Sequence, residues 1–169
     1  MGYVHLTDIC QFISPFAIGK SSGTWTPTVA SDAVSDLRTP ADAAFDLLIP
    51  LVQPGSDVGL QGARIKSVDV WYSISVAAAD DFATVEIDKL TLAATGTACT
   101  GTNPDITIDA DHDTAAERKA TGAHKMSVTL DTPCFIEDDI GYFLHLNVDA
   151  AATTVFALIG AQVNYDLRL

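Results

Sequence analysis

The most regular feature of this sequence is the alternation of apolar and polar residues after residue 44. Between residues 64 and 76, apolar side chains occupy every second position, and mostly polar ones lie between them. The first set is Val68, Val70, Tyr72 and Ile74, and the second is Ser67, Asp69, Trp71 and Ser73. A period of two predicts a β-strand with one buried face. Residues 125–131 and 141–149 repeat the pattern and predict two further strands.

Two other strands are predicted with a local irregularity. Residues 45–52 form an apolar run that contains Pro50. Proline lacks a backbone donor, so we expect this strand at a sheet edge or with a bulge. In residues 84–92 the apolar positions change phase near Asp88, which predicts a β-bulge at that point.

The last strand is predicted to span residues 155–169. Its apolar side chains occupy the odd positions throughout, and Phe156 and Leu158 make the other face apolar as far as Gly160. Strands that are apolar on both faces are usually covered on both. We therefore expect this strand to be central and its first half to be covered on both sides.

One short helix is predicted near residues 114–120. Thr114 and Glu117 have the spacing of a capping box, in which each side chain accepts a hydrogen bond from the other residue's backbone N–H. Gly122 is placed to end the helix. With barely two turns, this helix belongs to a loop and forms no packing layer.

These elements predict an all-β fold, an antiparallel two-sheet β-sandwich formed by residues 45–169, and a jelly roll is the topology we expect. Residues 1–44 differ, because they are rich in Ser, Thr, Ala, Asp and Pro after a first apolar segment. We interpret them as an N-terminal arm that packs on the sandwich or on a neighbouring subunit. An edge strand followed by a long loop is an equal alternative.

The composition indicates one domain that avoids nucleic acid and membranes. The chain has 169 residues, a net charge of -13 and nine scattered basic residues, so it repels phosphate backbones and anionic lipids. Only 18% of the residues are charged, below the usual ~25%, which suits close contact between subunits. No signal-peptide pattern opens the chain and no apolar run approaches ~20 residues, so we expect synthesis and folding in a cytoplasm.

Asp109, Asp111 and Asp113 are the clearest candidates for a metal site. Carboxylates at every second position resemble the opening of a calcium loop. Thr114 then replaces the glycine of an EF-hand, and Ala120 replaces its bidentate acid, which excludes that motif. A looser calcium site and a solvated acidic loop that caps the helix are both compatible with the pattern, and we favour the second.

Other chemistry has little support. The chain has no GxSxG motif and no glycine-rich phosphate loop, so no catalytic residue and no cofactor are predicted, and we expect no enzyme. The three cysteines form no CxxC pair, and no two of the four histidines lie at i+2 or i+4 spacing, which argues against zinc. Of these histidines, His145 is expected to be exposed or at an interface. Trp71 points away from the apolar face of its strand and is the best candidate for a sugar contact.

Three segments carry a resemblance: residues 66–74 (KSVDVWYSI), 111–119 (DHDTAAERK) and 160–169 (GAQVNYDLRL). They resemble small proteins from phage and prophage-like sequences. The acidic, Ala/Thr-rich, all-β chain is similar to phage virion accessory proteins, namely capsid decoration (cement) proteins and fibre components. The resemblance implies a protein of the virion that is often a homotrimer and that contacts other virion proteins, such as a major capsid protein. No binding residue carries over from it.

Two functions follow as hypotheses. The first is a structural virion protein that stabilises the capsid through contacts between subunits. The second is a carbohydrate-binding β-sandwich, a receptor-recognising tip or fibre component, which would use an exposed aromatic residue, Trp71 or Trp25, and could add calcium near Asp111.

Overall fold

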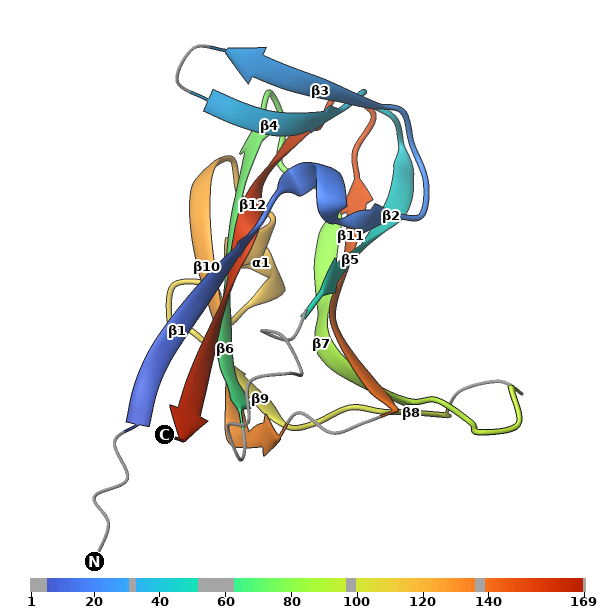
Figure 1. The fold of residues 1–169 in the computed structure, drawn as a ribbon. Helices are drawn as coiled ribbons and strands as arrows, with labels where there is room; N and C mark the ends of the chain where they lie inside the picture. The colour runs from blue at the N-terminus through green and yellow to red at the C-terminus, as the bar shows by residue number, and fades with distance from the viewer. Residues whose placement is uncertain (1–5, 31–32, 52–62, 97–99, 136–138, 169) are drawn as a thin grey trace, which may run out of the picture.

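The structure, a computed structural model, describes residues 6–30, 33–51, 63–96, 100–135 and 139–168. Two antiparallel sheets form a sandwich (Figure 1). The large sheet consists of β1 (Leu6–Ile13), β3 (Trp25–Ala30), β4 (Ala33–Arg38), β6 (Arg64–Ser75), β9 (Ile106–Ile108), β10 (Gly122–Phe135) and β12 (Val155–Arg168). The small sheet consists of β2 (Gly19–Lys20), β5 (Ala43–Pro50), β7 (Asp81–Thr91), β8 (Thr100–Thr102) and β11 (Ile140–Ala150). The predicted all-β, two-sheet sandwich is confirmed.

The strand order is that of a jelly roll. The large sheet contains the order β4-β12-β6-β10, and the small sheet contains the order β5-β11-β7-β8. The chain therefore crosses repeatedly between the sheets: β4, β6, β10 and β12 lie in one, and β5, β7, β8 and β11 lie in the other. Two interleaved four-stranded sheets of this kind make the jelly-roll connectivity.

Aromatic side chains join the two sheets in the core. Phe156 of β12 stacks on Tyr72 of β6, with ring centroids 5.5 Å apart, and meets Phe45 of β5 edge to face at 5.2 Å. Tyr72 also contacts Phe82 of β7 at 5.6 Å. All four side chains are fully buried. Aromatic pairs in these geometries add to the stabilisation from burial alone.

The strand β12 is central, as predicted, but its buried face changes midway. Phe156 and Leu158 are fully buried, whereas Ile159 is 39% exposed. The register with β6 shifts between Leu158 and Gly160, and Gly160 has a φ of 147°. After this bulge the odd positions point inward, beginning with Ala161. The expectation that the first half of β12 is covered on both sides is therefore wrong: its even positions face the core, whereas Ile159 on the other face is exposed, because the extra residue at the bulge inverts the alternation.

The bulge predicted near Asp88 is also wrong. Residues 84–91 of β7 pair with residues 140–147 of β11 without a break, and the register shifts only beyond Asn147. Leu90, whose apolar character prompted the prediction, packs over Gly101 of the neighbouring β8 instead. The prediction that Pro50 lies at a sheet edge agrees better with the structure. Only Leu47 and Leu48 of β5 pair with β2, and Pro50 ends β5 beyond them.

The described part of residues 1–44 contributes strands to both sheets. In Figure 1, β1 runs beside β12, and the register pairs the full length of β1, residues 6–13, with residues 168–161 of β12. After the 3-10 helix η1 (Pro15–Ala17), β2 joins the small sheet, and β3 and β4 form a hairpin. Ile13 and Ile18 are buried in the core. Contact of this segment with a neighbouring subunit stays a prediction.

The short helix is confirmed as α1 (Ala115–Arg118), with the predicted capping box. The hydroxyl of Thr114 accepts from the backbone N–H of Glu117, and the Glu117 carboxylate accepts from the backbone N–H of Thr114. Within the described residues, no helix has both the length and the apolar character needed to cross a bilayer.

Candidate functional site

Asp109, the first calcium candidate, organises its own loop. One carboxylate oxygen accepts from the backbone N–H of Asp111 at 3.1 Å and contacts Nδ1 of His112 at 2.7 Å, and the other accepts from the backbone N–H of Ser127. Burial by itself raises the pKa of Asp109. The hydrogen bonds together lower the pKa by more than burial raises it, so the pKa lies below its ordinary value. Both oxygens thus have partners within the protein.

The other two calcium candidates lie on the surface of the same loop. Asp111 and Asp113 are exposed. Hydrogen bonding and charge repulsion from Glu117 raise the pKa of Asp113. The structure does not bring the ligand oxygens of Asp109, Asp111 and Asp113 within 4.8 Å of one another as a group of three. The calcium site stays a prediction that this loop geometry does not favour.

Arg118 holds the loop onto the sandwich. It is buried, and its guanidinium donates to the backbone carbonyls of Phe82 at 2.9 Å, His112 at 2.8 Å, Asp113 at 3.0 Å and Ala83 at 3.3 Å. A planar guanidinium with five donors suits several fixed acceptors at once. The guanidinium of Arg118 therefore links the loop of residues 109–118 to β7.

Trp71 lies on the outer face of the large sheet, as the alternation predicted. Its neighbours Val70 and Tyr72 are fully buried, whereas Trp71 is half-buried and the Lys125 ammonium lies 5.4 Å from its ring. A cation above an indole is a favourable contact. The ring is therefore partly covered by its own chain, and its role in sugar binding stays a prediction.

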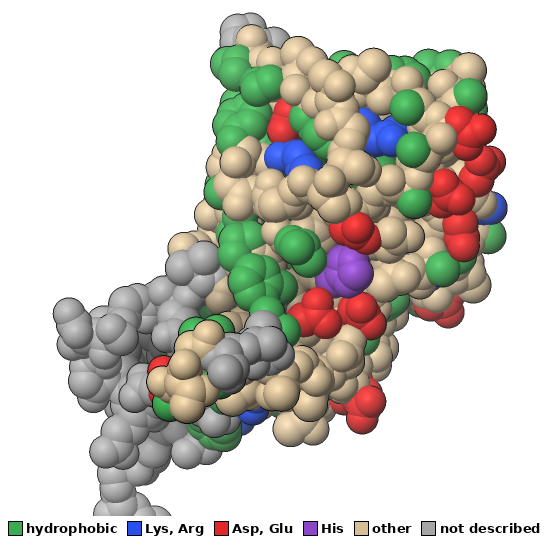
Figure 2. Space-filling view, turned by 90° about the vertical axis from the view of Figure 1, so that its right-hand side faces the viewer, with side chains coloured by type: hydrophobic (Ala, Val, Ile, Leu, Met, Phe, Trp, Pro, Cys, Tyr) green, Lys and Arg blue, Asp and Glu red, His purple; other side chains and the backbone are tan. Residues whose placement is uncertain are grey.

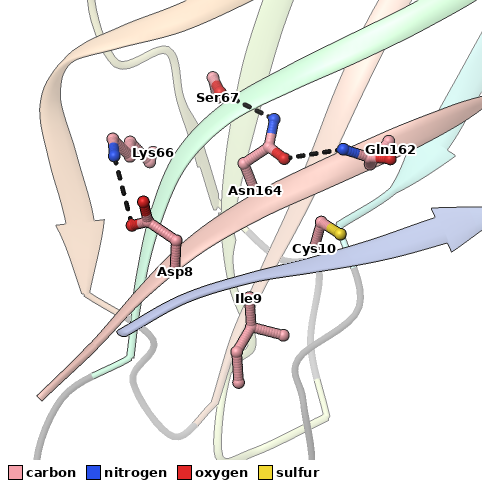
Figure 3. A pocket seen from close by; sticks show the side chains of 7 residues that line it. All are labelled: Asp8, Ile9, Cys10, Lys66, Ser67, Gln162 and Asn164. Carbon is pink, nitrogen blue, oxygen red and sulfur yellow. Dashed lines mark hydrogen bonds and ion pairs between the residues drawn. The ribbon is translucent and has the colours of Figure 1, made fainter. Parts of the chain in front are cut away.

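A polar hollow lies on the same outer face, between β1, β12 and β6. Its volume is ≈ 340 Å³, and it is lined by Asp8, Ile9, Cys10, Lys66, Ser67, Gln162 and Asn164. Figure 3 shows Asn164 between Ser67 and Gln162: it donates to the Ser67 hydroxyl at 3.1 Å and accepts from Gln162 at 3.0 Å. Lys66 lies 3.4 Å from the Asp8 carboxylate at the other end. Amide, hydroxyl and charged groups thus converge on one open depression.

Exposed apolar side chains concentrate in the N-terminal strands. Five of the ten exposed large hydrophobic residues in the described chain lie between residues 6 and 38: Ile9, Phe12, Phe16, Val29 and Val34. We call these five residues the N-terminal apolar strip. Phe12 is 63% exposed, with its ring against Gly160 of β12. Val29, 72% exposed, pairs with Val34 in the part of the β3–β4 hairpin that extends beyond the pairing of β4 with β12.

The sequence pattern missed one cluster around His145. This histidine is half-buried and lies beside Glu86, Asp88 and Asp46 on the outer face of the small sheet. The four residues come from three strands that are distant in sequence, so no local spacing reveals them. Of the remaining zinc candidates considered from sequence, His112 and His124 contact each other at 3.2 Å, while His5 and Cys99 lie outside the described residues.

Comparison with known proteins adds no relative. No family model matches the chain, and no curated protein matches it. The resemblance to phage virion accessory proteins therefore remains an expectation from the sequence, and the functional argument depends on the surface of the molecule itself.

Proposed function

We propose that this chain is a structural virion protein, a capsid decoration protein that associates with copies of itself, as a trimer, and with a major capsid protein. The observation that carries the proposal is the N-terminal apolar strip, which exposes large hydrophobic side chains on a chain with a net charge of -13. Contiguous exposed apolar patches mark interaction surfaces, and the strip is proposed to form one.

The charge pattern supports contact through this segment. Residues 21–31 contain no charged side chain. Cores of protein interfaces are depleted of charged residues, and two chains of equal charge approach most easily where they carry none. The uncharged strand β3 on an acidic jelly roll therefore suits association with a second copy. Among the described residues, β3 is also the terminal strand of its sheet, and another strand can add to such an edge.

The self-association is tested by light scattering after size exclusion. The full chain is expected to elute with three times the monomer mass, and Phe12→Ser combined with Val29→Thr is expected to shift it toward the monomer. Leu92→Ser is the matched control, because Leu92 is 56% exposed but lies outside the strip. A full chain that stays monomeric at all concentrations would contradict self-association, and equal shifts in both variants would remove the strip from the argument.

The virion assignment needs a second experiment. Antibodies against the full chain, coupled to gold, are applied to particles released by cells that carry its gene. Gold on the capsid supports a decoration protein. Gold on the tail supports a fibre component in its place, and particles without gold would reject a virion protein of either kind.

Carbohydrate binding is the alternative function, and two observations favour it. Trp71 projects from the outer face of the large sheet, and the same face carries the hollow with the amides of Asn164 and Gln162. Sugar sites combine an aromatic ring with such polar groups. On a broad glycan array, Trp71→Ala should lose binding, whereas Phe135→Ala, an exposed aromatic residue elsewhere, should keep it. No binding by the unaltered protein would exclude this alternative.

A further inference from the structure

The outer face of the small sheet carries a cluster of histidine and carboxylates. Figure 2 shows a histidine among acidic side chains on this face. His145 of β11 pairs directly with Glu86 of β7, and Asp88 lies two residues further along β7 on the same face. On the other side of β11, Asp46 of β5 is the partner of Asn147. Because directly opposite and diagonal neighbours on one face of a sheet are within reach, the pairing itself assembles the cluster.

Three ligand atoms already lie close to one another. Nδ1 of His145 is 3.0 Å from Oε1 of Glu86 and 4.0 Å from Oδ2 of Asp88, and the three residues each place one ligand atom within 4.8 Å of the other two. Two ligands at zinc–nitrogen and zinc–oxygen distances of about 2.1 Å from a tetrahedral ion are about 3.4 Å apart. Small side-chain rotations therefore suffice to place an ion between them.

The remaining polar atoms are held by an outer set of hydrogen bonds. Nε2 of His145 lies 3.1 Å from the carboxylate of Asp46, which the amide of Asn147 also contacts at 2.6 Å. When Nε2 carries an N–H that donates to Asp46, Nδ1 can use its lone pair to bind an ion held between the two other carboxylates. A metal-binding histidine generally has its second nitrogen fixed by a carboxylate in this way.

Asn103 completes this outer set on the opposite side. Its amide donates to Oε2 of Glu86 at 2.8 Å and to Oδ1 of Asp88 at 3.3 Å. These are the carboxylate oxygens that do not face His145, so Asn103 leaves Oε1 and Oδ2 turned toward Nδ1. The contact spans β7 and the segment after β8, and it orients both acids at once.

We propose that Glu86, Asp88 and His145 bind a divalent transition-metal ion, with Zn²⁺ as the best fit, and that Asp46 and Asn103 orient these ligands. One imidazole and two carboxylates match zinc, whereas calcium prefers oxygen ligands alone. The side chains of the three ligands are 23–39% exposed, so a fourth position is open to water or to a donor on a docked molecule. This inference is independent of the proposed function.

The test is a titration of the full chain with ZnCl₂, followed by isothermal calorimetry and by the melting temperature. The unaltered protein should bind one equivalent that His145→Ala and Glu86→Gln abolish, and zinc should raise the melting temperature only where that equivalent is bound. Asp46→Asn, which keeps the ligands, should weaken binding by about 10- to 100-fold. CaCl₂ at the same concentration should not displace the zinc.

The control variant is Asp80→Asn, which removes one exposed carboxylate outside the cluster. It should bind zinc as the unaltered protein does. The proposal is overturned if the unaltered protein has no saturable zinc site, if Glu86→Gln and Asp46→Asn leave binding unchanged, or if Asp80→Asn weakens it equally. If His145→Ala does not fold, Glu86→Gln and Asp46→Asn decide the question.

Discussion

The interior of the sandwich and the N-terminal strands differ in how far their apolar side chains are exposed to solvent. Between the sheets, Tyr72, Phe82 and Phe156 are fully buried, and both phenylalanine rings contact Tyr72. Along β1 to β4, Phe12 and Val29 are mostly exposed although they lie in regular strands. The difference teaches that the interior supplies the stability of the fold, while the N-terminal strands offer hydrophobic surface that the isolated chain leaves in contact with water.

Phe156→Ala should cause the largest loss of stability, because it empties the aromatic centre of the core. We expect the free energy of unfolding to fall by about 3–5 kcal/mol. Phe12→Ala removes the same side chain from the N-terminal strands and should cost less than about 1 kcal/mol, since Phe12 is mostly exposed. Urea denaturation measures both. Equal losses would show that the N-terminal strands belong to the same stability unit as the core.

Arg118→Leu should have the next largest effect, about 3 kcal/mol, because it leaves four backbone carbonyls near the buried guanidinium without their donor. Lys119→Ala is the matched control. Lys119 donates to the carbonyl of Asp80 at an exposed position, so its loss should cost about 0.5 kcal/mol. Thermal unfolding of the two variants compares them. A mild effect of Arg118→Leu would mean that the loop of residues 109–118 is not fastened through this side chain.

Gly160→Ala tests the contact between the two regions. A Cβ at this position would lie 2.7 Å from the ring of Phe12 and 2.9 Å from the carbonyl of Ile13, at a φ of 147° that side chains rarely adopt. We expect a loss of about 2 kcal/mol. Gly101→Ala has only an ordinary contact with Leu90 at 3.4 Å and should be nearly neutral. If the double variant Gly160→Ala/Phe12→Ala is as stable as Phe12→Ala alone, the ring and not the backbone causes the loss.

The smallest expected effect is a dependence on pH. The pKa of Asp109 is lowered in the fold, so its ionised form stabilises the folded state above the unfolded value of about 3.9. This contribution is lost as the pH falls below about 4 and through the folded pKa. Asp109→Asn should therefore lose stability less steeply than the unaltered protein in urea denaturation between pH 5 and pH 3. Parallel curves would contradict the role of Asp109.

Local patterns predicted the elements that depend on neighbouring residues. The alternation in residues 64–76 identified β6 and the outward direction of Trp71, and the spacing of Thr114 and Glu117 identified the helix. The position of the bulges depends on pairing with distant strands. Leu90 appeared out of phase because the sequence does not reveal that Gly101 of β8 lies beside it.

The candidate sites divide in the same way. Asp109, Asp111 and Asp113 lie at alternate positions of one short segment, so the sequence identifies them as a candidate site. In the structure, however, His112 and the backbone N–H of Ser127 bind the carboxylate oxygens of Asp109. The cluster at His145 is formed by cross-strand pairing, and only the register of β5, β11 and β7 reveals it. Residues 46, 86 and 145 have no common local pattern.

The position of β12 also determines when the protein can fold during its synthesis. Of all the described strands, β12 leaves the ribosome last, yet it lies at the centre of the large sheet, between β6 on one side and β4 and β1 on the other. Until it emerges, these three strands have no partner along the edges that will contact it. Pairing between residues 6 and 168 has a large sequence separation, and such contacts form slowly. The nascent chain therefore exposes open strand edges until β12 has emerged, which makes this interval vulnerable to aggregation.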